Sequence, residues 1–313
     1  MTQPSSSVPT GSSVSADAQG AVTPLSVVIA TLGGDFLAST IAHLNAGDRP
    51  PAEILICIPE AEAARARALE GGNVRLVVTS VRGQVAQRAE GFKRVREPFV
   101  LQLDDDMWID QRDIDLLMVE LQRLGPGNAV APVLRDKLNG RGIHRQHDGV
   151  RGVLQSLNAT ILGGVPWGAG RMGRVSAIGT NFGVDPERAT SPVMLVDWVP
   201  GGCVLHYREG LVLAAFFPFP SKAYCEDLIH SHLLKARGTR LWVVRDAGCR
   251  CDGFVLPTDV RAMMNEARAR WYFLRLTNAV GLRFWMWLAI SILKRLAVSA
   301  WRRPSGAQAS FVG

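Results

Sequence analysis

Three consecutive aspartates carry the clearest chemical signal in this sequence. Asp104, Asp105 and Asp106 directly follow the apolar stretch 98–103. If that stretch is a strand of an open α/β sheet, its carboxylates stand at the carboxyl edge, where such sheets bind ligands. Asp104 and Asp106 point to the same side of an extended backbone and suit a divalent cation, Mg²⁺ or Mn²⁺, that also holds phosphate oxygens. The alternative is helix capping by Asp106 or Asp110, which does not need three aspartates.

A second group that could bind phosphate lies upstream, in residues 82–88. A helix that starts near Gln84 presents Gln84, Gln87 and Arg88 on one face, and its first turn offers free N–H groups to an anion. The alternative is a solvated polar face. The glycine patterns GxGxxG after the first strand and GxxxxGK[ST] do not occur, so a nucleotide would have to be held by other means.

The elements that must position these residues alternate along the chain. Apolar segments predict strands at 25–30, 54–58, 74–79 and 99–103, and the intervening segments predict helices at 36–45, 60–70 and 84–95. Strands of nearly continuous β-branched residues between helices indicate an α/β fold, a mostly parallel sheet with helices on both faces. We therefore expect a Rossmann-like, nucleotide-binding half over residues 23–125.

The order of these features resembles the family 2 glycosyltransferases, which have the glycosyltransferase A fold. The matching features are a first strand at 26–31, a helix at 83–91, the DxD-type motif at 104–106, the segment 199–205 around Pro-Gly-Gly, the acidic pair Glu226-Asp227 and Gly238. The resemblance extends over about residues 24–250. It implies transfer of a sugar from a nucleotide-sugar donor to a glycan or lipid-linked acceptor.

The resemblance also implies a role for each aspartate of the motif. Asp104 and Asp106 would hold the metal ion, and Asp105 would contact the ribose or sugar of the donor alongside Asp104. A cation neutralises the leaving diphosphate without proton transfer. The resemblance thus predicts a metal-dependent enzyme.

Further donor contacts are expected at the strand ends and on the helix before the aspartates. Thr31 ends the first strand, and Gln84, Gln87 and Arg88 belong to that helix. Family members often carry an Asp after the second strand that contacts the base. This chain has Glu60 there instead, so Glu60 is the expected substitute.

The acidic pair supplies the expected general base. The acceptor hydroxyl must lose a proton as it attacks the anomeric carbon, and by resemblance Asp227 accepts it, with Glu226 beside it. One carboxylate tends to raise the pKa of its neighbour, which favours a base near neutral pH. A single displacement of this kind inverts the anomeric configuration. The alternative is an acidic pair placed at a helix N-terminus by the macrodipole alone.

The acceptor side is expected in residues 126–258, where the segment 138–183 is irregular and rich in glycine. Long connections inside a compact domain are usually functional or mobile. Trp167 or Trp198 could stack on a sugar, and Asp197 could approach the acceptor. The alternative is a surface insertion with Trp167 packed locally.

Composition limits the remaining possibilities. The chain has 313 residues, 47% of them hydrophobic, which is enough for a large core. Residues 1–22 contain few bulky apolar side chains, which predicts a disordered tail rather than a signal peptide. The five cysteines show no CxxC spacing. These features predict a cytoplasmic, reduced protein.

The C-terminal segment 259–313 has a different character. Between residues 261 and 303 there are nine basic residues and one acid, Glu266, against a net charge of +7 for the chain. Residues 283–303 predict a basic, tryptophan-bearing amphipathic helix, whose apolar run 284–293 is shorter than the span of about 20 residues that a bilayer requires. Such a helix fits peripheral contact with the inner face of the cell membrane. The alternative is packing on the catalytic domain or a partner. The very apolar opposite face argues against nucleic acid.

The sequence therefore predicts a metal-dependent, inverting glycosyltransferase. A sugar-phosphate nucleotidyltransferase is the alternative enzyme, although Gly33-Gly34-Asp35 lacks the basic residues of its glycine loop. The alternative that is not an enzyme is a non-catalytic glycan-binding protein with the same fold.

Overall fold

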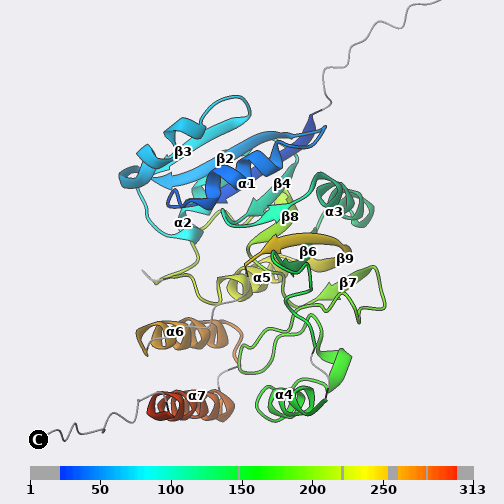
Figure 1. Cartoon of the computed structure of the whole chain (residues 1–313), viewed down its shortest axis with the longest axis vertical. Helices are drawn as coiled ribbons and strands as arrows, with labels where there is room; N and C mark the ends of the chain where they lie inside the picture. Colours follow the sequence, from blue (N-terminus) through cyan, green and yellow to red (C-terminus); the bar gives the residue numbers. More distant parts are fainter. Residues whose placement is uncertain (1–21, 147–148, 220–221, 253–259, 280, 302–313) are drawn as a thin grey trace, which may run out of the picture.

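The computed structural model describes residues 22–146, 149–219, 222–252, 260–279 and 281–301. The expected tail 1–22 lies outside these residues except for Val22, as do residues 302–313 of the C-terminal segment. Within the described residues the protein has an α/β fold. A mixed sheet carries helices on both faces, and a further layer of helices lies below it (Figure 1).

Nine strands form one sheet in the described part of the chain. Their order is β3-β2-β1-β4-β8-β6-β9-β5, and β7 pairs with β9. The neighbours from β3 to β4 are parallel, as are β6 and β9, whereas β8, β5 and β7 run antiparallel to their partners. The strands are β1 (Thr23–Ala30), β2 (Pro51–Pro59), β3 (Val74–Thr79), β4 (Phe99–Leu103), β5 (Trp108–Ile109), β6 (Asn128–Asp136), β7 (Val193–Val196), β8 (Cys203–Tyr207) and β9 (Arg240–Cys251). One sheet thus runs through both expected halves, 23–125 and 126–258.

The helices follow the predicted alternation with two differences. They are α1 (Phe36–Leu44), α2 (Gln84–Phe92), α3 (Gln111–Leu124), α4 (Gly149–Ile161), α5 (Glu226–Ala236), α6 (Val260–Leu276) and α7 (Leu282–Trp301). The helix expected at 60–70 is instead two 3₁₀ turns, Glu60–Arg65 and Arg67–Leu69. The first buries only Ala63 and the second buries nothing, so packing does not support a longer helix. The segment 138–183, expected to be irregular, contains α4 and a 3₁₀ turn at Gly168–Arg171.

Strand alternation divides the core between the two faces of the sheet. On β1, Val27 and Ile29 join the apolar cluster beneath α1 and α3, whereas Val28 points to the cluster beneath α2, as the period of two requires. Helix α2 lies very close to the sheet because Gly91 has no side chain. A Cβ there would clash with Cys57 Sγ and Val28. This contact sets how α2 presents its residues to the end of β4.

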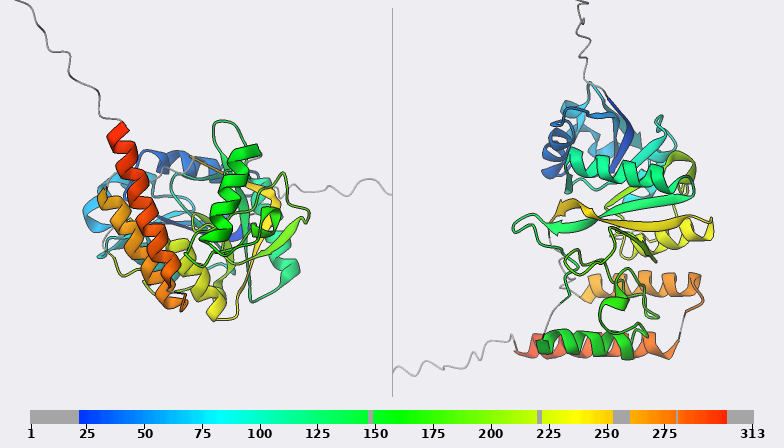
Figure 2. Two further views of the ribbon diagram at one scale, coloured as in Figure 1. Left: turned by 90° about the horizontal axis from the view of Figure 1, so that it is seen from below. Right: turned by 90° about the vertical axis from the view of Figure 1, so that its right-hand side faces the viewer.

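Below the sheet, α5 separates it from α6, and α7 and α4 form the lowest layer (Figures 1 and 2). Phe273 and Leu274 of α6 share an apolar cluster with Leu228 and Ile229 of α5, and Phe284 of α7 belongs to the same cluster. No helix among the described residues has the length and apolar character needed to cross a membrane.

Candidate active site

The three aspartates lie at the end of β4, between β1 and β8. The Asp104 backbone N–H donates to the Gly202 carbonyl oxygen at 2.8 Å. Gly201 and Gly202 allow this close approach, since a Cβ on Gly202 would stand 2.9 Å from Asp104 Oδ2 and one on Gly201 would clash with the Glu226 carboxylate. The Pro-Gly-Gly segment therefore lets the aspartates and the acidic pair meet.

Arg88 joins the two acidic groups, which are far apart in the sequence. Its Nη2 donates to Asp104 Oδ1 at 2.8 Å, and its Nη1 donates to both Glu226 oxygens at 3.3 Å, across 138 residues. The Arg88 side chain is only 3% exposed. Burial alone would lower the pKa of Arg88, but Glu226 and Asp104 outweigh it and raise that pKa. Buried Arg88 and Glu226 thus form a network with the partly buried Asp104, whose side chain is 23% exposed.

The glutamines of α2 hold protein atoms in place. Gln84 Nε2 donates to Asp104 Oδ1 at 2.8 Å. The Gln87 amide is buried, and it donates to the carbonyl oxygens of Thr31 at 2.7 Å and Cys57 at 2.8 Å. Gln84 and Gln87 were expected, like Arg88, to bind the donor; both line the cleft described below, and their amide N–H groups donate to protein atoms in this structure. The acceptors of these two amides, Asp104, Thr31 and Cys57, lie at or near the ends of strands, so the position of α2 relative to the sheet determines the hydrogen bonds.

A cleft of about 660 Å³ opens beside the aspartates. The Thr31 hydroxyl donates to the Asp105 carboxylate and accepts from the Gly33 N–H at 2.9 Å, and both Thr31 and Asp105 line the cleft. The remaining lining residues are Ala30, Leu32, Gly34, Arg82, Gly83, Gln84, Gln87, Phe219, Lys222 and Ala223. The sequence provided no motif that singled out Phe219, Lys222 and Ala223, which approach from the second half of the chain.

Glu226 and Asp227 begin α5. Cys225, just before them, has a left-handed backbone with φ of 56°, a strained conformation that clusters at functional sites. Asp227 Oδ2 accepts from Asn181 Nδ2 at 3.2 Å, a contact that the sequence did not indicate. Burial, together with the charge of Glu226, raises the pKa of Asp227 to about 7. Asp227 is therefore suited to exchange a proton near neutral pH.

The aspartate motif fits a cation that is shared with a phosphate ligand. Burial raises the pKa of Asp104 to about 6, with Arg88 acting in the opposite direction. The partly buried Asp106 makes no hydrogen bond or ion pair within the described residues, so its carboxylate is open to a cation. In the same residues no three His, Cys, Asp or Glu side chains group as metal ligands. Asp106 and the neighbouring Asp104 are thus the carboxylates that would hold a hard cation such as Mg²⁺ or Mn²⁺ together with phosphate oxygens of a donor.

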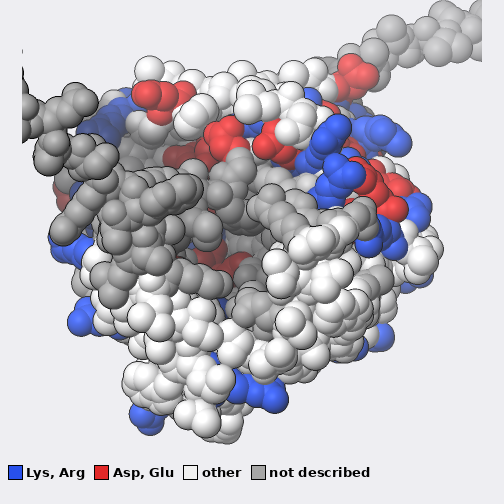
Figure 3. All heavy atoms as spheres, turned by 60° about the horizontal axis from the view of Figure 1, so that its bottom comes forward, with Lys and Arg blue, Asp and Glu red and all other residues white. Residues whose placement is uncertain are grey.

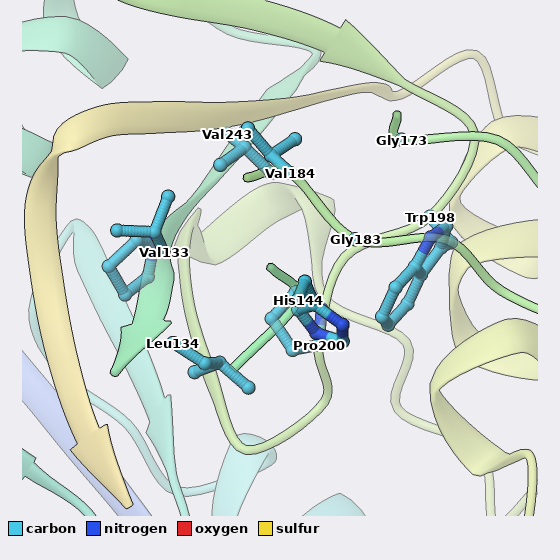
Figure 4. Close-up of a pocket in the computed structure, with 10 residues that line it drawn as sticks. Val133, Leu134, His144, Gly173, Gly183, Val184, Trp198, Pro200 and Val243 are labelled. Atoms are coloured by element: carbon cyan, nitrogen blue, oxygen red, sulfur yellow. The ribbon is translucent and has the colours of Figure 1, made fainter. Parts of the chain in front are cut away.

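Trp198 was expected to offer its ring to a sugar, but the structure buries it. It is 2% exposed and its Nε1 donates to the Phe182 carbonyl oxygen at 3.1 Å. The cavity beside it, which His144 also lines (Figure 4), has a volume of about 10 Å³, room for about one water molecule. Trp198 is therefore a core residue, and its large apolar ring explains the burial.

Two of the remaining expected site residues, Asp197 and Glu60, do not line the cleft. Asp197 pairs with Lys235 at 3.4 Å, in the last turn of α5, so it sits at the opposite end of that helix from Asp227. Glu60 is exposed and does not line the cleft. Trp167 is 54% exposed and remains a candidate stacking surface.

The sequence matches the family model described as "Glycosyl transferase family 2" over residues 26–182, half of the chain. The protein therefore belongs to the family 2 glycosyltransferases. A search of curated proteins found no match. Membership of this family favours glycosyl transfer over the alternative of nucleotidyl transfer.

One solved structure with a TM-score above 0.5, that of GalNAc-T7, agrees with this fold. GalNAc-T7, crystallised with UDP, GalNAc and Mn²⁺, is similar with a TM-score of 0.53 and 14% identity over 78% of this chain. A mycobacterial protein has a TM-score of 0.47 and 17% identity, covering 82% of this chain and 74% of its own. Residues 1–349 of TarS from S. aureus have a TM-score of 0.42 and 14% identity, covering 80% and 65%. This chain spans about half, 48%, of the GalNAc-T7 chain, so that similarity concerns the glycosyltransferase A fold alone.

Proposed function

We propose that this protein transfers a sugar from a nucleotide-sugar donor to a glycan or lipid-linked acceptor, with inversion and with the help of Mg²⁺ or Mn²⁺. The observation that supports this most directly is the Arg88 network, which brings the aspartate motif and the acidic pair to one place beside a large cleft. A donor-binding motif and a base candidate are thus neighbours in space although they are far apart in the sequence.

Each residue has a defined part in this mechanism. The donor lies in the cleft, where Arg82 and Lys222 supply positive charge and Asp105, fixed by Thr31, faces its ribose or sugar. Asp104 and Asp106 would hold the cation, which neutralises the leaving diphosphate when bound. Asp227 accepts the proton of the acceptor hydroxyl as the oxygen attacks the anomeric carbon. Arg88 and Gln84 keep Asp104 in position, and Asn181 orients Asp227.

Peripheral contact with the cytoplasmic face of the cell membrane, through residues 283–303, is part of the proposal. Its support is the basic, tryptophan-bearing composition of α7, which suits an anionic membrane interface.

The test is transfer and hydrolysis of a panel of nucleotide sugars with Mn²⁺ or Mg²⁺, compared with the same reactions in chelator. We expect Asp227→Asn to lower turnover by about 10²- to 10⁴-fold, the usual contribution of a general base, with donor affinity retained. Asp106→Ala should weaken metal-dependent donor binding, as measured by calorimetry.

The control variant is Asp246→Ala, because Asp246 is an exposed carboxylate on β9 that pairs with Arg245. It should behave like wild type. If Asp106→Ala and Asp227→Asn both turn over every donor as fast as wild type, the proposed mechanism is wrong.

A further inference from the structure

Helix α4 turns its apolar stripe away from the protein. Five apolar side chains with helical spacing are between 45% and 77% exposed: Val150, Val153, Leu154, Leu157 and Ile161. The inward face carries Gly152, Ser156 and Ala159, which are buried. Ser156 Oγ accepts a hydrogen bond from buried Arg171 at 2.6 Å. A helix on a water-soluble surface normally has the reverse orientation.

Helix α7 divides its apolar residues between two directions. Phe284 is 2% exposed and packs on Trp271 of α6 with ring centroids 5.1 Å apart, and Arg270 lies 4.3 Å from the centre of the Trp287 ring. This edge corresponds to the alternative of packing on the catalytic domain. Other apolar residues of α7 remain outside, each between 37% and 75% exposed: Leu282, Trp285, Met286, Ile292 and Leu293.

The two outward stripes belong to one surface. Figure 1 and both views of Figure 2 place α4 and α7 beside each other in the lowest layer of the molecule. The backbone that follows α4 also touches the start of α7, since a Cβ on Gly164 would clash with the Arg283 guanidinium. We call the exposed apolar residues of these two helices the α4–α7 face.

Charge is distributed very unevenly around this face. Residues 149–184 and 260–301 together hold ten basic residues and one acid, which leaves 25 basic and 27 acidic residues in the rest of the chain. In Figure 3, with the lower side turned forward, the lower half of the surface shows uncharged atoms with Lys and Arg between them, while the visible Asp and Glu gather above and in a central hollow. The layer that carries the face is therefore cationic, and the body of the protein is not.

We propose that the α4–α7 face lies in the interface of an anionic lipid bilayer, with α4 inserted as well as α7. Two exposed apolar stripes on neighbouring helices suit the boundary between headgroups and acyl chains, the basic segments complement anionic headgroups, and Trp285 is a residue type that favours headgroup depth. A second copy of the chain would bring two cationic layers together, which like-charge repulsion disfavours. The inference extends the contact proposed for residues 283–303 and does not require sugar transfer.

The experiment is co-flotation of the full chain with vesicles of phosphatidylcholine alone or with about 30% phosphatidylglycerol, which gives a negative surface. Wild type should float with the anionic vesicles. Leu154 in α4 is 60% exposed on the protein and Leu293 in α7 is 63% exposed, and the proposal inserts both side chains into the lipid. Leu154→Glu and Leu293→Glu should each weaken binding about tenfold or more, because each replaces an inserted apolar side chain by a carboxylate. The matched control is Val119→Glu in α3, where the side chain is 58% exposed and away from the face; it should float like wild type.

Three outcomes overturn the inference. The first is undiminished flotation of the Leu154→Glu Leu293→Glu double variant. The second is an effect of Leu293→Glu alone, which would exclude α4 from the contact. The third is a lipid-free dimer that Leu154→Glu dissociates, in a protein that binds no vesicles, which would assign the face to a second copy. Because a variant can fail to fold, quenching of wild-type tryptophan emission by brominated lipids is measured in parallel. We expect quenching that Trp285→Phe reduces, and its absence would also refute the inference.

Discussion

The Arg88 guanidinium lies between two carboxylates and supplies the positive charge that both of them need. It is 3% exposed and contacts Asp104 and Glu226 at once. Without Arg88, both carboxylates would remain close together with no counter-charge in a buried setting. The geometry of the aspartate motif and of the acidic pair therefore depends on one guanidinium.

This dependence should be visible in stability. Arg88→Met should lower the free energy of unfolding by about 3–5 kcal/mol, the usual cost of removing one partner from a buried ion pair. Urea unfolding measures the change. Arg82→Met serves as the control, because Arg82 is 65% exposed and its pairing with Glu62 should contribute about 1 kcal/mol at most. Equal stabilities for the two variants would contradict the role given to Arg88.

The acidic pair should also control the pH dependence of the reaction. Asp227, with its pKa raised to about 7, must be deprotonated to act as a base. The rate should therefore rise as pH increases through about 7 and then level off. Glu226→Gln removes one cause of the raised pKa, so this rise should move to lower pH, although burial will keep it above the ordinary value for an aspartate. A pH–rate profile of wild type and variant measures the shift, and a profile without any rise in wild type would contradict Asp227 as the base.

The same pKa can be checked without turnover. A carboxyl whose pKa is raised on folding contributes stability below its unfolded pKa and loses it as pH rises through the folded value. The unfolding free energy of wild type should therefore decrease between about pH 4, the ordinary pKa of an aspartate, and about pH 7, and then level off, a decrease that Asp227→Asn should lack.

Among the secondary-structure elements, those with a strong apolar pattern were the most predictable. The strand expected at 99–103 is β4 to the residue, and 74–79 is β3, because nearly continuous apolar runs mark strands of a covered parallel sheet. Helix α4 has a clear apolar period, but its glycine-rich surroundings suggested a loop. The outward orientation of its apolar stripe could not be deduced, since the helical period shows that one face is apolar but not whether that face packs on the protein core or points away from it.

The site was predictable in its motifs and less so in its contacts. The aspartates and the acidic pair do come together. The contacts that Gln87 and Arg88 make with protein atoms could not be predicted from the sequence, because they depend on tertiary placement. Trp198 is buried and Trp167 exposed, a difference that residue type alone does not reveal, since tryptophan serves in cores and at binding surfaces alike.

The close contact of α2 with the sheet gives a prediction at this scale. Gly→Ala within a helix ordinarily stabilises a protein by about 0.5–1 kcal/mol. Gly91→Ala should instead destabilise by about 1–3 kcal/mol, since the new methyl group overpacks against Cys57 and Val28. Chemical denaturation measures both this variant and the control Gly210→Ala, whose methyl group would meet open space. A stabilised Gly91→Ala would show that α2 can move away from the sheet.

At the scale of the whole molecule, charge separates the helical layer from the catalytic body. If the basic layer meets anionic lipid, binding of wild type to anionic vesicles should weaken steeply between about 0.1 M and about 1 M salt, as the screening length falls from about 10 Å to about 3 Å. Flotation or surface plasmon resonance at several salt concentrations measures this. Neutral vesicles provide the control, since their weaker, apolar binding should change little. Salt-independent binding to anionic vesicles would argue that charge plays no part.

The bond from Arg88 to Glu226 also has a consequence for how this enzyme can be recombined. Arg88 lies in the first half of the chain and Glu226 lies 138 residues later, in the second half. A chimera that joined residues 1–125 of this protein to the second half of a relative without a matching acid would bury an arginine short of one partner. The two halves therefore have to be exchanged together, or the acid has to be transplanted with the arginine.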